Sequence, residues 1–244
     1  MSSSLPQYRR IADALVAAIR SGELEVGGRM PSERELSAEF GVSRMTARGA
    51  LKALVDQGLV SSIEAKGYFV SVSRIDQRLQ TLTSFSEDMR RSGRRSSSIV
   101  LAARMVPASG EVAARLAVAE GSAVFHLLRL RQADSVPVAL EAAHIPESLA
   151  PGLIEAADFA AESLYATLRR RYGILPVEAE QSFEASAATE SDAAILQVET
   201  GAPVLRLTRL SLSADGRPVE FVQSVYRGDR FTMRVRLAPG STDA

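Results

Sequence analysis

The chain has 244 residues, with 29 Lys and Arg, 29 Asp and Glu, two His and no Cys, and its formal net charge is zero. The lack of Cys excludes disulfides, thiolate metal sites and Cys nucleophiles. Two His residues that lie far apart in the sequence argue against a His-based metal cluster, so we expect no metal and no cofactor. No apolar run approaches the ~20 residues of a membrane span and no signal peptide opens the chain, so we expect a cytoplasmic protein without membrane contacts.

Helix signals begin near the N-terminus. Apolar residues at helical spacing predict a helix over residues 7–21. Ser32 and Glu35 have the spacing of a capping box, which predicts a second helix from Ser32 to about Phe40. Gly41 can adopt the left-handed conformation that ends such a helix. Both ends of the second helix are therefore marked in the sequence.

A third helix follows after a short turn. Ser43 is a capping residue, the apolar residues after it recur on one helical face, and Gly58 is a helix stop. Two helices joined by a short turn that contains Gly form a helix-turn-helix, in which the start of the second helix enters the DNA major groove. Strand-like segments on both sides of residues 63–67 predict a short hairpin, or wing. Residues 1–72 are therefore predicted to form a winged helix-turn-helix DNA-binding domain.

The start of the third helix carries the residues expected to meet DNA, which are Arg44, Thr46 and Arg48. Residues 41–55 contain three cations and no acid, so a chain of zero net charge still has a local positive surface. A groove-reading helix needs one apolar face for the core and one polar face for phosphates and base edges. The alternative is an ordinary solvated helix face, but it leaves the capped preceding helix and the hairpin unexplained.

Residues 6–70 resemble the DNA-binding domain of the GntR-type bacterial regulators. The resemblance is carried by the stretches PSERELS, FGVSRMTAR and GYFV. It implies sequence-specific binding to double-stranded DNA, with Lys66 and Gly67 at the wing tip in the minor groove. The residues it implies as DNA contacts are Arg34, Ser43, Arg44, Thr46, Arg48, Lys66 and Gly67.

The rest of the chain has the pattern of an α+β domain. Residues 73–82 lack a strong period and are expected to be a linker, and residues 83–244 form the second domain. The sequence contains an internal repeat with a spacing of 80 residues, in which Ala113 corresponds to Ala193 and Arg129 to Arg209. Each copy contains a helix, a Gly turn and a hairpin, so two halves are expected to form one mainly antiparallel sheet with helices on a face. The expected strands are 97–106, 123–132, 136–145, 177–187, 204–213, 218–226 and 232–237.

Charged and hydroxyl residues in this second domain suggest a binding site for a small anion. Arg129 and Arg131 share one strand face and offer donors suited to phosphate or carboxylate, and Glu141 lies opposite Arg129 if the hairpin is tight. Ser163 and Tyr165 open a helix, whose free N–H groups and dipole both favour negative charge. The alternative is a simple ion pair between Arg129 and Glu141 on a solvated sheet face.

Residues 81–240 resemble the UTRA effector domain of the HutC-type GntR regulators, an antiparallel-sheet domain with the chorismate-lyase fold. The motifs are TSFSEDM, ESLYATL and PVEFVQSVYRGDRF. Within that group the chain is most similar to the regulators of N-acetylglucosamine use, which bind hexosamine phosphates. The resemblance implies that Phe85, Ser86, Ser163 and Tyr165 bind the phosphate. It implies that the sugar is lined by Arg129, Arg131, Glu141, Glu220 and Tyr226.

Together these features predict a homodimeric repressor that reads a palindromic operator. A small anionic effector, best a hexosamine phosphate such as N-acetylglucosamine 6-phosphate, is expected to control its operator affinity through the linker. The effector could also be a phosphonate, a carboxylate or a fatty acid. Two other functional classes are a chorismate-lyase-like enzyme, for which the sequence shows no evident nucleophile with a base, and a DNA-architectural protein with a structural dimer domain.

Overall fold

The computed structural model describes residues 6–25, 27–56, 59–71 and 74–237. The chain divides into two compact units, Met1–Ser73 and Arg74–Ala244. The predicted helix stop at Gly58 lies outside the described residues. Within the described part, no helix is long and apolar enough to cross a membrane, and no group of His, Cys, Asp and Glu could hold a metal ion.

The first unit is a three-helix domain with a hairpin, as predicted. Its elements are α1 (Gln7–Ser21), α2 (Glu33–Phe40), α3 (Arg44–Asp56), β1 (Val60–Ile63) and β2 (Gly67–Val70). The capping box is present, since Ser32 Oγ accepts from the Glu35 N–H and the Glu35 carboxylate accepts from the Ser32 N–H. Gly41 takes a left-handed conformation with φ 62° and ends α2. These caps fix the turn that orients α3 against α2.

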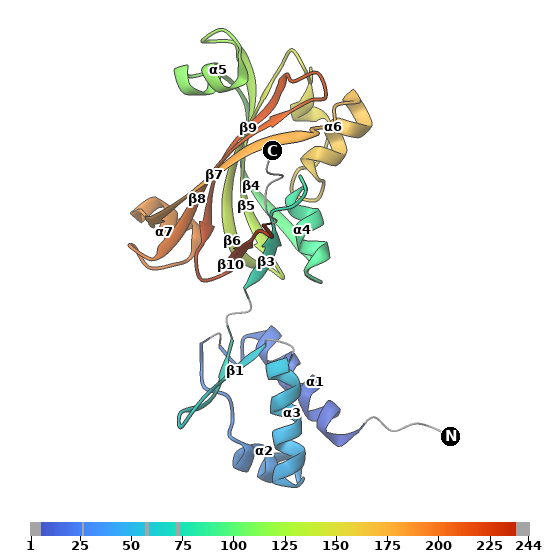
Figure 1. Cartoon of the computed structure of the whole chain (residues 1–244), viewed down its shortest axis with the longest axis vertical. Helices are drawn as coiled ribbons and strands as arrows, with labels where there is room; N and C mark the ends of the chain where they lie inside the picture. The colour runs from blue at the N-terminus through green and yellow to red at the C-terminus, as the bar shows by residue number, and fades with distance from the viewer. Residues whose placement is uncertain (1–5, 26, 57–58, 72–73, 238–244) are drawn as a thin grey trace, which may run out of the picture. The chain divides into compact units, whose positions relative to one another are not determined.

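The second unit is built on one six-stranded antiparallel sheet with the order β4-β5-β6-β9-β8-β7 (Figure 1). The turn between β5 and β6 is tight, because Asp134 and Ser135 both take positive φ. The sheet strands are β4 (Ser96–Pro107), β5 (Ala123–Ala133), β6 (Val136–Pro146), β7 (Glu178–Ala187), β8 (Pro203–Leu212) and β9 (Pro218–Arg227). The two halves of the internal repeat meet where β6 pairs with β9.

Helices cover both faces of this sheet, whereas the sequence led us to expect helices on a single face. Figure 1 shows α4 (Phe85–Arg91) and α6 (Leu164–Tyr172) on one side, and α5 (Gly110–Leu116) and α7 (Glu190–Leu196) on the other. Successive side chains of a strand point to opposite faces. In β5, Phe125 packs in the core under α6 and Val124 packs in the core with α5. Both faces are apolar there, so both require a covering layer.

Part of the stretch expected to be an irregular linker is a strand of the second unit. β3 (Ile75–Arg78) pairs in parallel with β10 (Phe231–Arg234), outside the main sheet. The closing strand expected at 232–237 is shorter, and it lies outside the main sheet. Ile75 and Phe231 are buried in one cluster with Tyr226. A four-residue strand held mainly by this distant contact is too short to show a period in the sequence.

Candidate effector pocket and DNA-binding surface

A polar pocket lies on the α4 and α6 face of the sheet, and its floor comes from β5 and β6. Arg129 is 4% exposed and pairs with Glu141 at 2.5 Å, directly across the hairpin. Arg131, also 4% exposed, places its guanidinium 4.2 Å from the centre of the Phe85 ring and donates to Ser98 Oγ at 2.8 Å. The pair of Arg129 with Glu141 is therefore mostly buried in a pocket and does not lie on a solvated sheet face.

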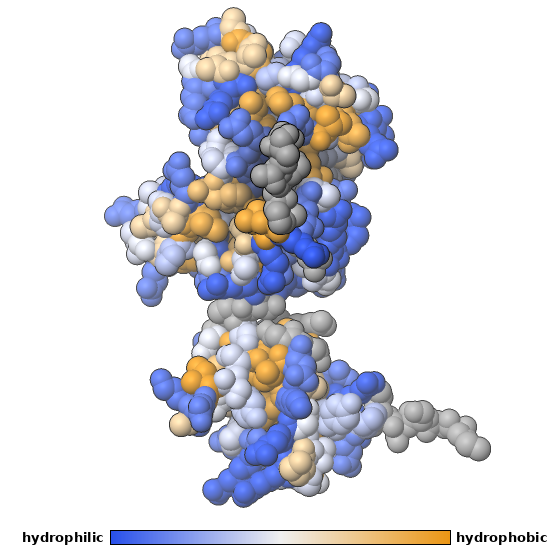
Figure 2. Space-filling model, viewed as in Figure 1, coloured by the Kyte–Doolittle hydropathy of each residue, from blue (hydrophilic) through white to orange (hydrophobic). Residues whose placement is uncertain are grey.

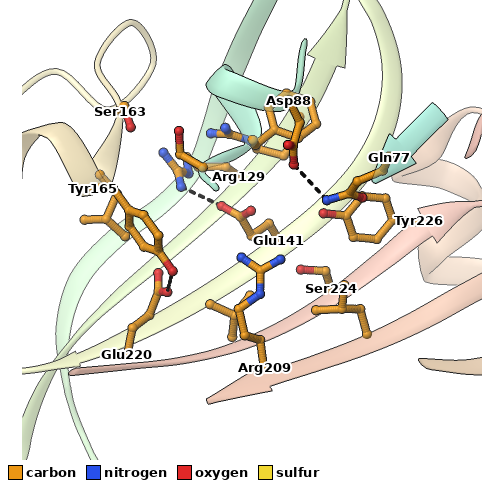
Figure 3. A pocket seen from close by; sticks show the side chains of 16 residues that line it. Gln77, Asp88, Arg129, Glu141, Ser163, Tyr165, Arg209, Glu220, Ser224 and Tyr226 are labelled. Carbon is orange, nitrogen blue, oxygen red and sulfur yellow. Dashed lines mark hydrogen bonds and ion pairs between the residues drawn. The ribbon is translucent and has the colours of Figure 1, made fainter. Parts of the chain in front are cut away.

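The second half of the repeat supplies the other side of the pocket. Arg209 on β8 lines it and donates to Gln181 Oε1 at 2.6 Å. Tyr165, in the first turn of α6, donates its hydroxyl to Glu220 Oε2 at 2.8 Å, and Ser211 Oγ donates to the same carboxylate oxygen at 3.3 Å. Figure 3 shows Arg129 with Glu141 and Tyr165 with Glu220 around one shared space.

Burial and neighbouring charges shift the pKa values of the acids in the pocket in different directions. The Arg131 and Arg129 guanidiniums hold the pKa of Glu141 at about 2, although burial alone would raise it. Burial lowers the pKa of Arg131 to about 10, which leaves it a cation at neutral pH. Burial and the nearby Glu141 raise the pKa of Glu220, and burial raises the pKa of Asp88. Glu141 therefore stays ionised beside the arginines, whereas burial works against the charged forms of Glu220 and Asp88.

Several donor atoms of residues that line the pocket have no hydrogen-bond partner in the part of the chain that the structure describes. Among the described residues, Arg129 Nε and Nη1 and Arg131 Nε are buried and have no hydrogen-bond partner. The hydroxyl of Ser224, on β9, is likewise buried and has no hydrogen-bond partner among these residues. A buried polar group without a partner costs free energy, so each such group in a native protein needs an explanation. A bound anion with several oxygens would satisfy these donors together.

The pocket brings together eight of the nine effector residues expected from the sequence. Ser86 is the exception, since it is half-buried in α4 and its side chain does not line the pocket. The other eight are Phe85, Arg129, Arg131, Glu141, Ser163, Tyr165, Glu220 and Tyr226. Ser163 also caps α6, with its Oγ accepting from the Ala166 N–H at 3.5 Å.

Sequence reasoning missed five polar residues that line the same pocket, namely Gln77, Ser84, Asp88, Arg209 and Ser224. The repeat carried a signal for Arg209, because it is the counterpart of Arg129. Asp88 stands inside the motif TSFSEDM without having been singled out. Gln77 lay in the stretch taken as linker, so no pattern pointed to it.

The first unit presents a basic surface around the start of α3. Arg44 and Arg48 are exposed there, and Arg34 on α2 and Lys66 at the hairpin tip are exposed as well. Arg34, Arg44 and Gly67 line one shallow groove, joined by Arg29 from the loop before α2. No pattern in the sequence singled out Arg29. Figure 2 shows that the end of this unit formed by α2 is hydrophilic.

Two of the expected DNA contacts are already oriented by neighbours in the first unit. Ser43 Oγ accepts from the Thr46 N–H at 3.1 Å and so caps α3, and it lies 2.8 Å from Thr46 Oγ1. Arg48 Nε donates to Glu33 Oε1 at 2.8 Å, and this contact lowers the pKa of Glu33. Tyr68 on the wing donates to the same oxygen at 3.2 Å. The Arg48 side chain is 59% exposed, and its contact with Glu33 holds the guanidinium in place.

Comparison with known proteins decides which family has this combination of units. Residues 7–70 match the profile of the bacterial regulatory proteins of the gntR family, and residues 91–232 match the UTRA domain. The chain belongs to the GntR family. Its members carry this DNA-binding domain, and the matched relatives are transcription regulators rather than enzymes, so the protein is a DNA-binding transcription regulator.

Full-length relatives support this assignment. The chain is 40% identical to the HTH-type transcriptional repressor NagR of Bacillus subtilis (strain 168), with 94% of each chain covered. It is 31% identical to the mannosyl-D-glycerate transport/metabolism system repressor MngR of Escherichia coli (strain K12), with 93% of this chain and 95% of MngR covered. The crystal structure of PhnF from Mycobacterium smegmatis matches with a TM-score of 0.71 and 30% identity, over 93% of this chain and 99% of that one.

Proposed function

We propose that this GntR regulator is a homodimeric repressor whose affinity for a palindromic operator is controlled by a small anionic effector bound in the pocket of the second unit. The observation that carries the proposal is the group of buried Arg129 and Arg131 nitrogens that have no partner among the described residues. A dimer would present two α3 helices to two half-sites in successive turns of the major groove. The relatives NagR and MngR are both repressors.

The effector that the pocket suits best is a hexosamine phosphate such as N-acetylglucosamine 6-phosphate. Arg129 and Arg131 suit a phosphate, and Glu141 and Glu220 can accept from sugar hydroxyls or an amide N–H. The sequence resembles the regulators of N-acetylglucosamine use, and NagR is 40% identical. The MngR name, which refers to mannosyl-D-glycerate, keeps an anionic sugar carboxylate as the second candidate.

Ligand binding can be tested by thermal denaturation. At a concentration about 100 times its Kd, N-acetylglucosamine 6-phosphate should stabilise the chain by about 2.7 kcal/mol and raise its Tm by several degrees. Glucose 6-phosphate, a glycerate, a phosphonate, a fatty acid and inorganic phosphate are the comparison ligands. The Arg131→Met variant should lose the shift, whereas Arg217→Ala, at an exposed arginine, should keep it. No shift with any sugar phosphate would reject this effector class.

DNA recognition can be tested at the start of α3. Arg44→Ala and Arg48→Ala should each weaken binding to an operator, selected from a random DNA pool with the wild-type chain, by about 1–3 kcal/mol and relax its base preference. Fluorescence anisotropy with operator and scrambled DNA measures both effects. Arg217→Ala removes the same charge from the second unit and should bind operator as the wild type does. Unchanged affinity and base preference in both α3 variants would show that another surface reads the DNA.

A further inference from the structure

One wall of the pocket belongs to β3, the first strand of the second unit in the sequence. Gln77 on this strand lies four residues after Ser73, is 6% exposed and lines the pocket. Its Nε2 donates to Asp88 Oδ2 at 2.8 Å, and Thr83 Oγ1 donates to Asp88 Oδ1 at 2.6 Å. Figure 3 shows Gln77 and Asp88 joined beside Tyr226. These two bonds connect β3 to α4 and to the loop before it.

The contact with Asp88 decides which way the Gln77 amide is turned. A carboxylate can only accept hydrogen bonds, so the amide nitrogen faces Asp88 and the amide oxygen faces away from it. Gln77 Oε1 is buried and has no hydrogen-bond partner among the described residues. Gln77, a residue of the pocket lining, therefore carries an unused acceptor on the β3 side, in addition to the unused donors of Arg129 and Arg131 on β5.

β3 is also the point at which the chain enters the second unit. Ile75 is opposite Phe231 in the parallel pair with β10, and its N–H donates to the Arg230 carbonyl at 2.6 Å. Ile75 and Phe231 are both buried. Gln77 is two residues from Ile75 on the same strand, so a displacement of its side chain acts on a short, packed segment that continues directly to the boundary with the DNA-binding unit.

We propose that Gln77 couples the pocket to the DNA-binding unit by accepting, at Oε1, a hydrogen bond from a hydroxyl or amide N–H of the bound effector. This inference rests on the effector role proposed above and adds to it that the ligand carries a neutral donor as well as an anionic group. The ligand then stabilises one position of β3, and this preference is what changes operator affinity. Gln77 is a positioning residue for the switch, whereas Arg129 and Arg131 supply the affinity for the anion.

The test separates ligand affinity from the response at saturation. The full-length Gln77→Met chain has a side chain of similar length without an amide. It should bind N-acetylglucosamine 6-phosphate about 10-fold more weakly by calorimetry. At saturating ligand, the ratio of its operator Kd values with and without ligand should fall close to one. Ser224→Ala, which removes another buried polar group without a partner from the pocket, should also weaken ligand binding but keep the wild-type ratio.

Each outcome bears on a different proposal. A wild-type ratio in Gln77→Met at saturating ligand would overturn the coupling role while leaving the effector role intact. Failure of the wild-type chain to bind any sugar phosphate would remove both. If Gln77→Met does not bind operator in the absence of ligand, it is not properly folded, and Asp88→Asn decides by the same criterion. That variant keeps the shape of Asp88 but no longer fixes the orientation of the Gln77 amide, so its ratio should also be reduced.

Discussion

Replacing Arg129 with Met should lower the free energy of unfolding of the ligand-free chain by about 3 kcal/mol or more, because it leaves Glu141 as a buried carboxylate without its nearest counter-ion. The two side chains are 4% and 13% exposed. The guanidiniums of Arg131 and Arg129 keep the pKa of Glu141 at about 2, so the carboxylate stays ionised at neutral pH. Urea denaturation followed by circular dichroism measures the loss.

Two further variants show whether burial is the reason for this loss. In Arg129→Met/Glu141→Leu both partners become apolar, so the double variant should be more stable than Arg129→Met alone. Arg170 pairs with Glu162 at 2.6 Å, but the side chains are 59% and 40% exposed. Arg170→Ala should therefore cost less than about 1 kcal/mol. Equal losses from Arg129→Met and Arg170→Ala would contradict the description of Glu141 as a buried charge held by arginine.

The same variants distinguish structural from ligand-binding roles in the pocket. Both Arg129 variants should fail to bind a sugar phosphate, whatever their stability, because Arg129 supplies two of the unpartnered donors. If the double variant is stable and does not bind, then the ion pair serves the ligand. In that case the buried charges of the pocket are present for ligand binding and not for stability.

The DNA-binding unit was predictable because its signals are local. Caps such as Ser32 with Glu35, and the stop at Gly41, act within one or two turns of the helix that they delimit, and the structure confirms them. The β5–β6 hairpin was predictable for the same reason. Its tight turn fixes the register that places Glu141 opposite Arg129.

Features that depend on distant parts of the chain could not be predicted. β3 is held by β10, more than 150 residues later, so the stretch around Gln77 looks irregular in the sequence. The covering of both sheet faces depends on which face of the sheet each helix packs against. The sequence of a single helix or strand does not determine that choice. Arg209 was only partly predictable. The repeat relates it to Arg129, but only the assembled sheet brings the two residues into one pocket.

A pair of histidines on the other face of the sheet should make the stability of the second unit depend on pH. His126 Nδ1 and His144 Nε2 lie 2.9 Å apart and share one hydrogen bond, so a proton on both rings would set two N–H groups against each other. Burial, and next the neighbouring His126, lower the pKa of His144 from 6.5 to about 4, and burial also lowers the pKa of His126. Two cations lie near the pair. Arg104 is opposite His126 on β4, and Arg115 lies 5.9 Å from the centre of the Phe221 ring, which stacks on His144.

Because the folded-state pKa of His144 is below its unfolded value, the unfolded chain binds the extra proton first as the pH falls. The contribution of His144 to stability is therefore complete above about pH 7, and about 2 kcal/mol of it is lost by about pH 5 and about 3 kcal/mol by about pH 4. Hydrogen exchange of the β5 and β6 amides, with urea denaturation, follows this loss. His144→Gln cannot titrate and can still bond to His126, so its stability should fall less steeply over the same interval. The chain has only two His residues, so His126→Gln/His144→Gln gives the baseline set by the carboxylates. A slope in the wild type that equals this baseline would show that the pair does not resist protonation.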